Sequence, residues 1–138
     1  MNTRRQVRQL AMQVLFAFDA NQKDSPDIAR QVAKDSMIED TLQNEAVSWA
    51  REAWKAHEQS DVWVTRLSPQ WPTPRQPGVD RALLRLCVWE LTHRDTPPKV
   101  VIDEAIEISR EYSTENSPAF LNGVLDAVLK EITAAKGV

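Results

Sequence analysis

Three arginines stand close together near the start of the chain, and their side chains could bind phosphate groups. Arg4, Arg5 and Arg8 are accompanied by no acidic residue before Asp19. A guanidinium group presents a rigid fork of donors that matches phosphate oxygens, and phosphate contacts supply much of the affinity for nucleic acids. The cluster opposes the dipole of a helix N-terminus, and its alternative interpretation is a solvated basic end. We interpret it as a candidate RNA-binding motif.

A second candidate binding segment reads NSPAFLNGVL and begins at Asn116. Asn116 and Ser117 would place polar donors at a helix N-terminus, where anions bind readily. Phe120 could stack on an unpaired base, and Asn122 could hydrogen-bond a base edge. The alternative is that Ser117 only caps the helix and that Phe120 only packs in the core.

The other reactive side chains form no recognisable active site. His57 and His93 lie far apart and in no metal-ligand spacing. Cys87 is flanked by leucines and reads as a small buried hydrophobe without an activating base. Three carboxylates spaced four residues apart fit the solvated side of an amphipathic helix: Asp103, Glu107 and Glu111. We expect no catalytic residue, no metal site, no cofactor and no enzymatic activity.

Composition is that of one globular domain. The chain has 138 residues, of which 42% are hydrophobic and 27% charged, and its net charge is −3. Because Cys87 is the only cysteine, no intramolecular disulfide can form. Gln9 and Gln13 interrupt the apolar part of the N-terminal segment, so it does not read as a signal peptide. No stretch approaches the ~18 apolar residues of a membrane span, and we expect a cytoplasmic protein.

Apolar periodicity, prolines and capping residues predict an all-α bundle of seven helices. The predicted helices cover about 3–20, 26–36, 39–57, 60–67, 79–94, 98–112 and 117–135. A connection with four prolines, residues 68–78, joins an N-terminal helical half of about 1–67 to a C-terminal half of 79–138 within a single domain. Serine at Ser25 and proline at Pro26 favour a helix start there.

The helix predicted over residues 79–94 is apolar around most of its circumference, so we expect it to be the hub of the core. Arg81 and Arg85 share its polar strip, and Glu90 is expected to pair with Arg94 at the i+4 position. In the next helix we expect Tyr112 to face inward. In the helix predicted over residues 60–67 we expect Val62, Trp63 and Val64 to be the apolar residues that face the core.

Four segments of the sequence resemble the NusB family: RRQVRQLAMQVLFAFD, VDRALLRLCVWEL, PPKVVIDEAIEISREYS and SPAFLNGVLDAV. They follow the order and approximate spacing of that family and span nearly the whole chain. The resemblance implies an all-α fold of two packed three-helix subdomains. It also implies a transcription antitermination factor that binds boxA-type single-stranded RNA together with NusE, a ribosomal small-subunit protein, in the transcription elongation complex.

Carried over to this chain, the resemblance implies particular binding residues. The arginine-rich RNA motif falls on Arg4, Arg5 and Arg8, and a second RNA-contacting region falls on Ser117, Phe120 and Asn122. The partner surface falls around Phe16, Asp80 and Arg81, where Asp80 would contribute a charge pair and Phe16 an apolar anchor. Phe16 stands where the family often has tyrosine, Asn116 where an acid is frequent, and the arginine motif is leaner than in some members.

Two other functions fit the same helical module. It could be the RNA-binding part of a ribosomal-RNA cytosine methyltransferase, although the sequence has no βαβ pattern, no cofactor glycines and no Pro-Cys dipeptide. It could also be a helical protein-interaction module without RNA binding. Some relatives self-associate, and five tryptophans could form an exposed apolar patch, which leaves a homodimer open.

Overall fold

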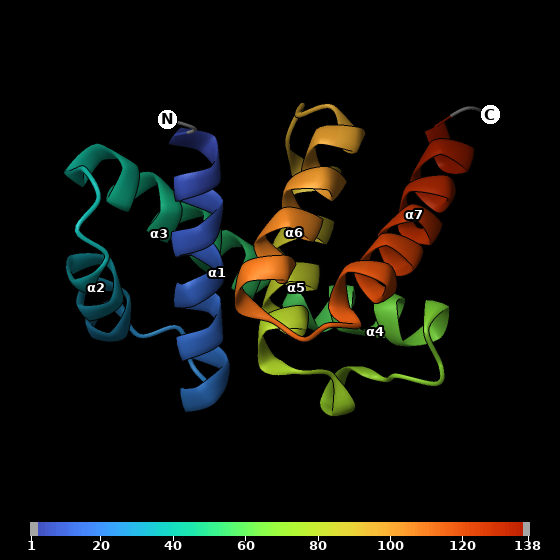
Figure 1. Ribbon diagram of the computed structural model, residues 1–138, viewed down its shortest axis with the longest axis horizontal. Coiled ribbons are helices and arrows are strands. Elements are labelled where there is room, and N and C mark those ends of the chain that lie inside the picture. The colour runs from blue at the N-terminus through green and yellow to red at the C-terminus, as the bar shows by residue number, and fades with distance from the viewer. Residues whose placement is uncertain (1–2, 137–138) are drawn as a thin grey trace.

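A computed structural model describes residues 3–136, and over that range it consists of seven α-helices and one short 3₁₀-helix (Figure 1). The α-helices are α1 (Thr3–Asn21), α2 (Pro26–Asp35), α3 (Asp40–Lys55), α4 (His57–Leu67), α5 (Gly78–His93), α6 (Pro98–Tyr112) and α7 (Ser117–Lys136). The 3₁₀-helix η1 (Thr73–Arg75) lies in the proline-rich connection. The predicted all-α fold is confirmed, with helix ends within a few residues of those expected.

Local sequence signals explain where α2 begins. The Ser25 hydroxyl accepts a hydrogen bond from the Ile28 backbone N–H at 3.3 Å, and Pro26 occupies the first turn of α2. Helices α3 and α4 are separated by a single residue, Ala56. We expected a wider gap there, but no glycine or proline separates the two helices, so α4 starts at His57.

The helices pack around α5 (Figure 1). The first helix, α1, packs against α2, α3 and α5, whereas α5, α6 and α7 pack against one another. Helix α4 contacts α5 and α7 and, less extensively, α3. The division of the chain into two halves at the connection stays a prediction, and α1 and α4 each pack across it. None of the helices within residues 3–136 combines the length and apolar character needed to cross a membrane.

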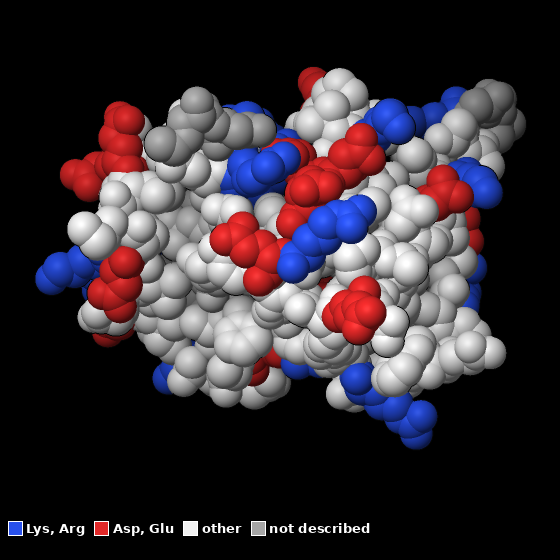
Figure 2. Space-filling view, in the orientation of Figure 1, with Lys and Arg blue, Asp and Glu red and all other residues white. Residues whose placement is uncertain are grey.

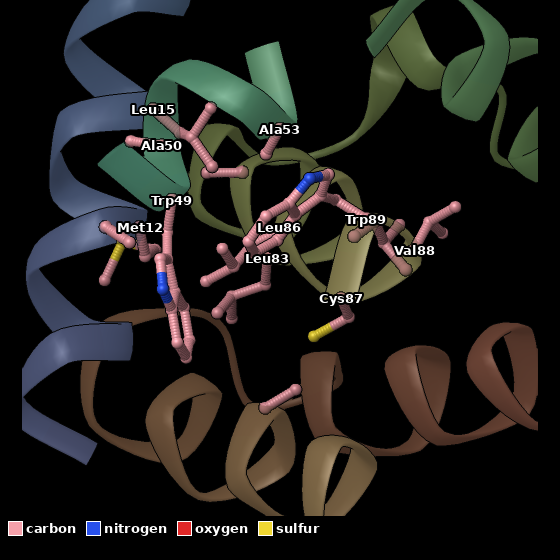
Figure 3. Close-up of a cluster of buried hydrophobic side chains, with 14 of the residues drawn as sticks. Met12, Leu15, Trp49, Ala50, Ala53, Leu83, Leu86, Cys87, Val88 and Trp89 are labelled. Carbon is pink, nitrogen blue, oxygen red and sulfur yellow. The ribbon is translucent and has the colours of Figure 1, made fainter. Parts of the chain in front are cut away.

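The hub role predicted for α5 is confirmed. Its Leu83 and Leu86 side chains face Met12 and Leu15 of α1 and the small residues of α3 in the core (Figure 3). Leu86 is 1% exposed, and Cys87, as expected, is buried. Nearby, the rings of Trp49 and Trp89 have centroids 5.7 Å apart. A ring of other helices therefore encloses α5 on nearly all sides.

Two expectations about apolar residues were wrong. Tyr112 is 38% exposed instead of facing the core, because it is the last residue of α6. Val62 is 72% exposed, although the sequence placed it among the buried residues of α4. In α4 it is Val64, at 2% exposure, that packs inward. Both exposed side chains therefore belong to the surface.

An ionic network ties α1, α4 and α5 together. Asp19, near the end of α1, accepts hydrogen bonds from Arg81 at 2.5 and 2.9 Å and from Arg85 at 3.0 Å. Arg85 also binds Asp61 of α4 through two bonds of 2.7 and 3.0 Å. Burial acts to raise the pKa of Asp19, but the hydrogen bonds and charges of the two arginines outweigh it, and the pKa lies below its ordinary value.

Candidate nucleic-acid interface

Each of the three N-terminal arginines holds a carboxylate from a different helix. Arg4 makes two hydrogen bonds to Glu45 of α3, one of them 2.7 Å long. Arg5 binds Glu104 of α6 at 2.5 and 3.3 Å. Arg8 binds Glu90 of α5 at 2.6 and 3.0 Å. The first turns of α1 therefore join three helices through paired, two-point contacts.

Exposure separates Arg8 from the other two arginines. The side chain of Arg8 is 4% exposed and that of Glu90 is 0% exposed, whereas Arg4 and Arg5 are 44% and 40% exposed. Burial acts to lower the pKa of Arg8, but the hydrogen bonds and charge of Glu90 outweigh it and raise the pKa. Our expectation that Glu90 pairs with Arg94 was wrong, because α1 delivers a closer cation into the core.

Arg94 instead lies over the ring of Trp49, 4.5 Å from its centroid. Arg4 and Arg8 also lie near this ring, at 5.8 and 5.7 Å. Figure 2 shows that the start of α1 and the neighbouring face of α6 carry interspersed basic and acidic side chains. The arginine turn is thus not part of a continuous basic surface, because acids from α3, α5 and α6 accompany it.

At the start of α7, Ser117 is buried and fixed. Its hydroxyl donates a 2.9 Å hydrogen bond to Asp80 of α5, and Ser113 donates a 2.6 Å hydrogen bond to the other oxygen of that carboxylate. Ser117 also accepts a hydrogen bond from the Thr114 backbone N–H at 3.2 Å. The contacts dock α7 on α5. In this structure Ser117 therefore positions the helix start instead of facing solvent.

Phe120 and Asn122 stand closer to the surface. Phe120 is half-buried and lines a groove beside the proline-rich connection, and Asn122 is exposed on α7. Asn116, just before the helix, is also exposed and lines the same groove. A Cβ atom at Gly123 would meet nothing within 4 Å, so the backbone there is open to an approaching molecule. This part of α7 can make contacts that buried Ser117 cannot.

The residues expected to bind a protein partner also differ in exposure. Phe16 is 45% exposed, and its ring lies over Gly78, where an added Cβ would come within 2.6 Å of a ring carbon. Asp80 is only 2% exposed and Arg81 is held by Asp19. The expectation that Asp80 offers a surface charge was wrong, because Ser113 and Ser117 use that carboxylate internally.

These residues form two groups on the molecule. Gly78 and Asp80, at the start of α5, bring Phe16 and Ser117 to the same region of the fold. The arginine turn lies at the opposite end of α1 from Phe16, and α6 runs between α1 and α7 (Figure 1). The structure therefore places the α7 segment beside the expected partner residues. The three arginines lie at the other end of α1.

Sequence reasoning missed the groove itself and two residues in it. Trp71 and Arg75, from the proline-rich connection, line this hollow together with Asn116 and Phe120. A tryptophan among prolines, outside any apolar period, was the signal that could have revealed an exposed aromatic side chain. The remaining reactive groups lie apart: His57 is half-buried, His93 is exposed, and burial raises the pKa of the Cys87 thiol. Across residues 3–136 no cluster of three metal-binding side chains is present.

Comparison with solved structures first places the protein in a class of small all-α proteins. The fold matches T. maritima NusB with a TM-score of 0.80 and 32% identity, covering 95% of this chain and 92% of that one. It also matches a chain from a crystal structure of antitermination factors NusB and NusE in complex with dsRNA, with a TM-score of 0.84 and 25% identity, covering 95% and 98% of the two chains.

Sequence comparison then gives the family. Residues 5–130 match the NusB family, and the chain belongs to it. A relative from Solibacter usitatus, named transcription antitermination protein NusB, is 38% identical over 96% of this chain and 92% of its own length. The protein of that name from Symbiobacterium thermophilum is 34% identical over 98% of this chain and 94% of its own length. The resemblance seen in the four sequence segments is confirmed.

Proposed function

We propose that the protein is a transcription antitermination factor that binds boxA-type single-stranded RNA together with NusE. In this role it supports ribosomal RNA transcription as part of the elongation complex, in the cytoplasm. The observation that carries the proposal is the family match over residues 5–130. The likeness to NusB in its complex with NusE and dsRNA supports it. Because that complex contains double-stranded RNA, preference for a single strand is part of the proposal.

Arg4 and Arg5 would contact RNA phosphates by exchanging their carboxylate partners. Both guanidinium groups are partly exposed, and both already hold oxygen pairs with a geometry similar to that of phosphate oxygens. Arg8 would act differently, because its buried pair with Glu90 fixes the helix that carries the other two. Phe120 and Asn122 would contribute base contacts from α7, and Ser117 would hold that helix in place.

NusE would dock on the surface beside Phe16. This aromatic side chain is 45% exposed at the junction of α1 and α5, where its ring covers Gly78. Asp80 and Arg81 would support the surface from beneath, since their side chains bind Ser117 and Asp19. The partner would raise RNA affinity by extending one binding surface across both proteins.

The proposal includes no catalytic step. The chain covers 92% of the length of a relative named as an antitermination protein, which favours that role over the RNA-binding part of a methyltransferase. A protein-interaction module without RNA binding is the second candidate. The ionic pairing of all three N-terminal arginines favours it, since each guanidinium already has an internal acceptor.

A titration of boxA-like RNA, with and without NusE, tests the proposal. We expect binding that weakens as salt rises, because phosphate contacts release counterions. NusE should tighten it, and a scrambled single strand and a boxA duplex should bind more weakly. If the RNA does not bind in either the presence or the absence of NusE, the protein is not an RNA-binding antitermination factor.

A further inference from the structure

Arg75 differs from every other arginine of the structure. Within residues 3–136, each of the others either forms an ion pair with a carboxylate or, in the case of Arg94, lies over the ring of Trp49. Arg75 does neither. It is exposed on η1, in the connection between α4 and α5. A guanidinium group without an internal acceptor is available to bind an external anion.

The groove that Arg75 lines also exposes aromatic surface. Its walls are the connection, with Trp71 and Arg75, and the start of α7, with Asn116 and Phe120; we call it the connection groove. Trp71 is 54% exposed, which is unusual for so large an apolar side chain. The hollow measures about 450 Å³, within the range of ~300–1,000 Å³ typical of small-ligand sites.

The connection carrying these side chains is held firmly. The Trp71 backbone N–H donates to the Ser68 carbonyl at 3.0 Å, and the Gln76 side-chain amide donates to the Trp71 carbonyl at 3.1 Å. Arg81 donates to the carbonyls of Thr73 and Gln76, at 3.1 and 2.9 Å. The backbone on both sides of Arg75 is therefore bonded to α5, and the groove is formed before any ligand binds.

We propose that the connection groove receives one unpaired nucleotide of the bound RNA. The base stacks on the exposed ring of Trp71 or on Phe120, and the phosphate lies at Arg75. Asp80 is also part of the lining, but Ser113 and Ser117 occupy its carboxylate, so the phosphate is directed toward the arginine end. Asn116 also lines the groove, and its side-chain amide can bind a base edge. This inference rests on the proposed function and adds Trp71 and Arg75 to its RNA site.

Four variants of the full chain test the inference with boxA-like RNA. Trp71→Ala should weaken RNA binding by about 5- to 100-fold, the usual effect of losing one stacked base. Trp71→Phe should restore much of the affinity, because it keeps a ring. Arg75→Gln should weaken binding and reduce the slope of log affinity against log salt by about 0.7, as expected for one lost single-strand phosphate contact. Arg30→Gln removes another exposed cation, on α2, and should leave both quantities unchanged.

The outcomes separate this inference from the proposed function. If wild-type protein binds the RNA but Trp71→Ala and Arg75→Gln bind it equally well, the groove holds no nucleotide, although the proposed function survives. If those variants lose NusE and keep RNA binding, the groove is a protein site and the inference is overturned. If wild-type protein binds no RNA, both fall. Circular dichroism spectra of all variants should match wild type, because the changed side chains lie at the surface.

Discussion

Arg8 and Glu90 form a buried ion pair, 2.6 Å at its shortest, that joins the first turns of α1 to the last turns of α5. Taking two charges out of water is costly, and the attraction between them offsets that cost only while both are present. The pair also lies within the enclosed core around α5, where no solvent can replace a lost partner. Arg8 is thus a structural residue of the arginine turn, and several measurements can distinguish it from its neighbours.

Removing one member of the Arg8–Glu90 pair should destabilise the protein strongly. Glu90→Gln leaves the Arg8 charge buried, and we expect a loss of about 3–5 kcal/mol in the free energy of unfolding. The double variant Arg8→Met with Glu90→Leu should recover much of that loss, since no charge is left unpaired. Urea denaturation, monitored by circular dichroism, measures the free energy of unfolding of the single and the double variant. Equal stability of Glu90→Gln and wild type would contradict the burial of this pair.

Releasing Arg4 from its carboxylate should tighten RNA binding. Arg4 donates two hydrogen bonds to Glu45, and they lower the pKa of that carboxyl group. Because exposed ion pairs contribute about 0–1 kcal/mol, Glu45→Gln should raise RNA affinity by at most about fivefold. Glu52→Gln, which removes an exposed acid elsewhere on α3, is the matched control. If the two variants bind RNA alike, Arg4 does not exchange its partner for phosphate.

Acid should weaken the network around Asp19. The pKa of Asp19 lies below its ordinary value of 3.8 in the folded protein. A lowered carboxyl pKa contributes stability that is present above the unfolded value and is lost as pH falls through the folded one. Asp19→Asn should therefore be less stable than wild type at pH 7, and the difference should shrink on acidification below 3.8. Unfolding curves recorded across this pH range measure the difference in stability between the variant and wild type. A difference that stays constant would contradict the ionic role of Asp19.

Truncating the hub of the core should have a large and purely structural effect. Leu86 is 1% exposed, and Leu86→Ala should cost about 2–5 kcal/mol because it leaves a cavity among enclosed neighbours. Val62→Ala, at a position 72% exposed, should change stability little. Thermal unfolding of the two variants measures the difference in stability. Equal stability of the two would contradict the assignment of Leu86 to the core.

The partner surface can be tested through Phe16 and Asp80 separately. Phe16→Ala should weaken capture of NusE in a pull-down while leaving the fold intact, because the ring is 45% exposed. Asp80→Asn keeps the shape but weakens the bonds from Ser113 and Ser117, so it should lower stability more than partner affinity. Should Phe16→Ala capture NusE as well as wild type does, the interface lies on another face.

Much of this fold follows from local sequence signals, and much of the site does not. Ser25, Pro26 and the apolar periods place the helices well, since capping and periodicity act between residues a few positions apart. The partner of Glu90 could not be found in that way, because an i+4 rule considers only neighbours on the same helix. Arg8 reaches Glu90 only after two helices pack together, and the same is true of Ser117 and Asp80.

The long sequence separation of the arginine contacts has a consequence for the order of synthesis. Arg4, Arg5 and Arg8 meet acids that follow them by 41, 99 and 82 positions. As the chain emerges from the ribosome, the acid that pairs with Arg4 is made with α3 and the one that pairs with Arg8 is made with α5. The acid that pairs with Arg5 is made only with α6. Contacts this distant also slow folding, because the intervening loops must close first. Neutralisation of the N-terminal helix is thus among the last events in the maturation of the protein.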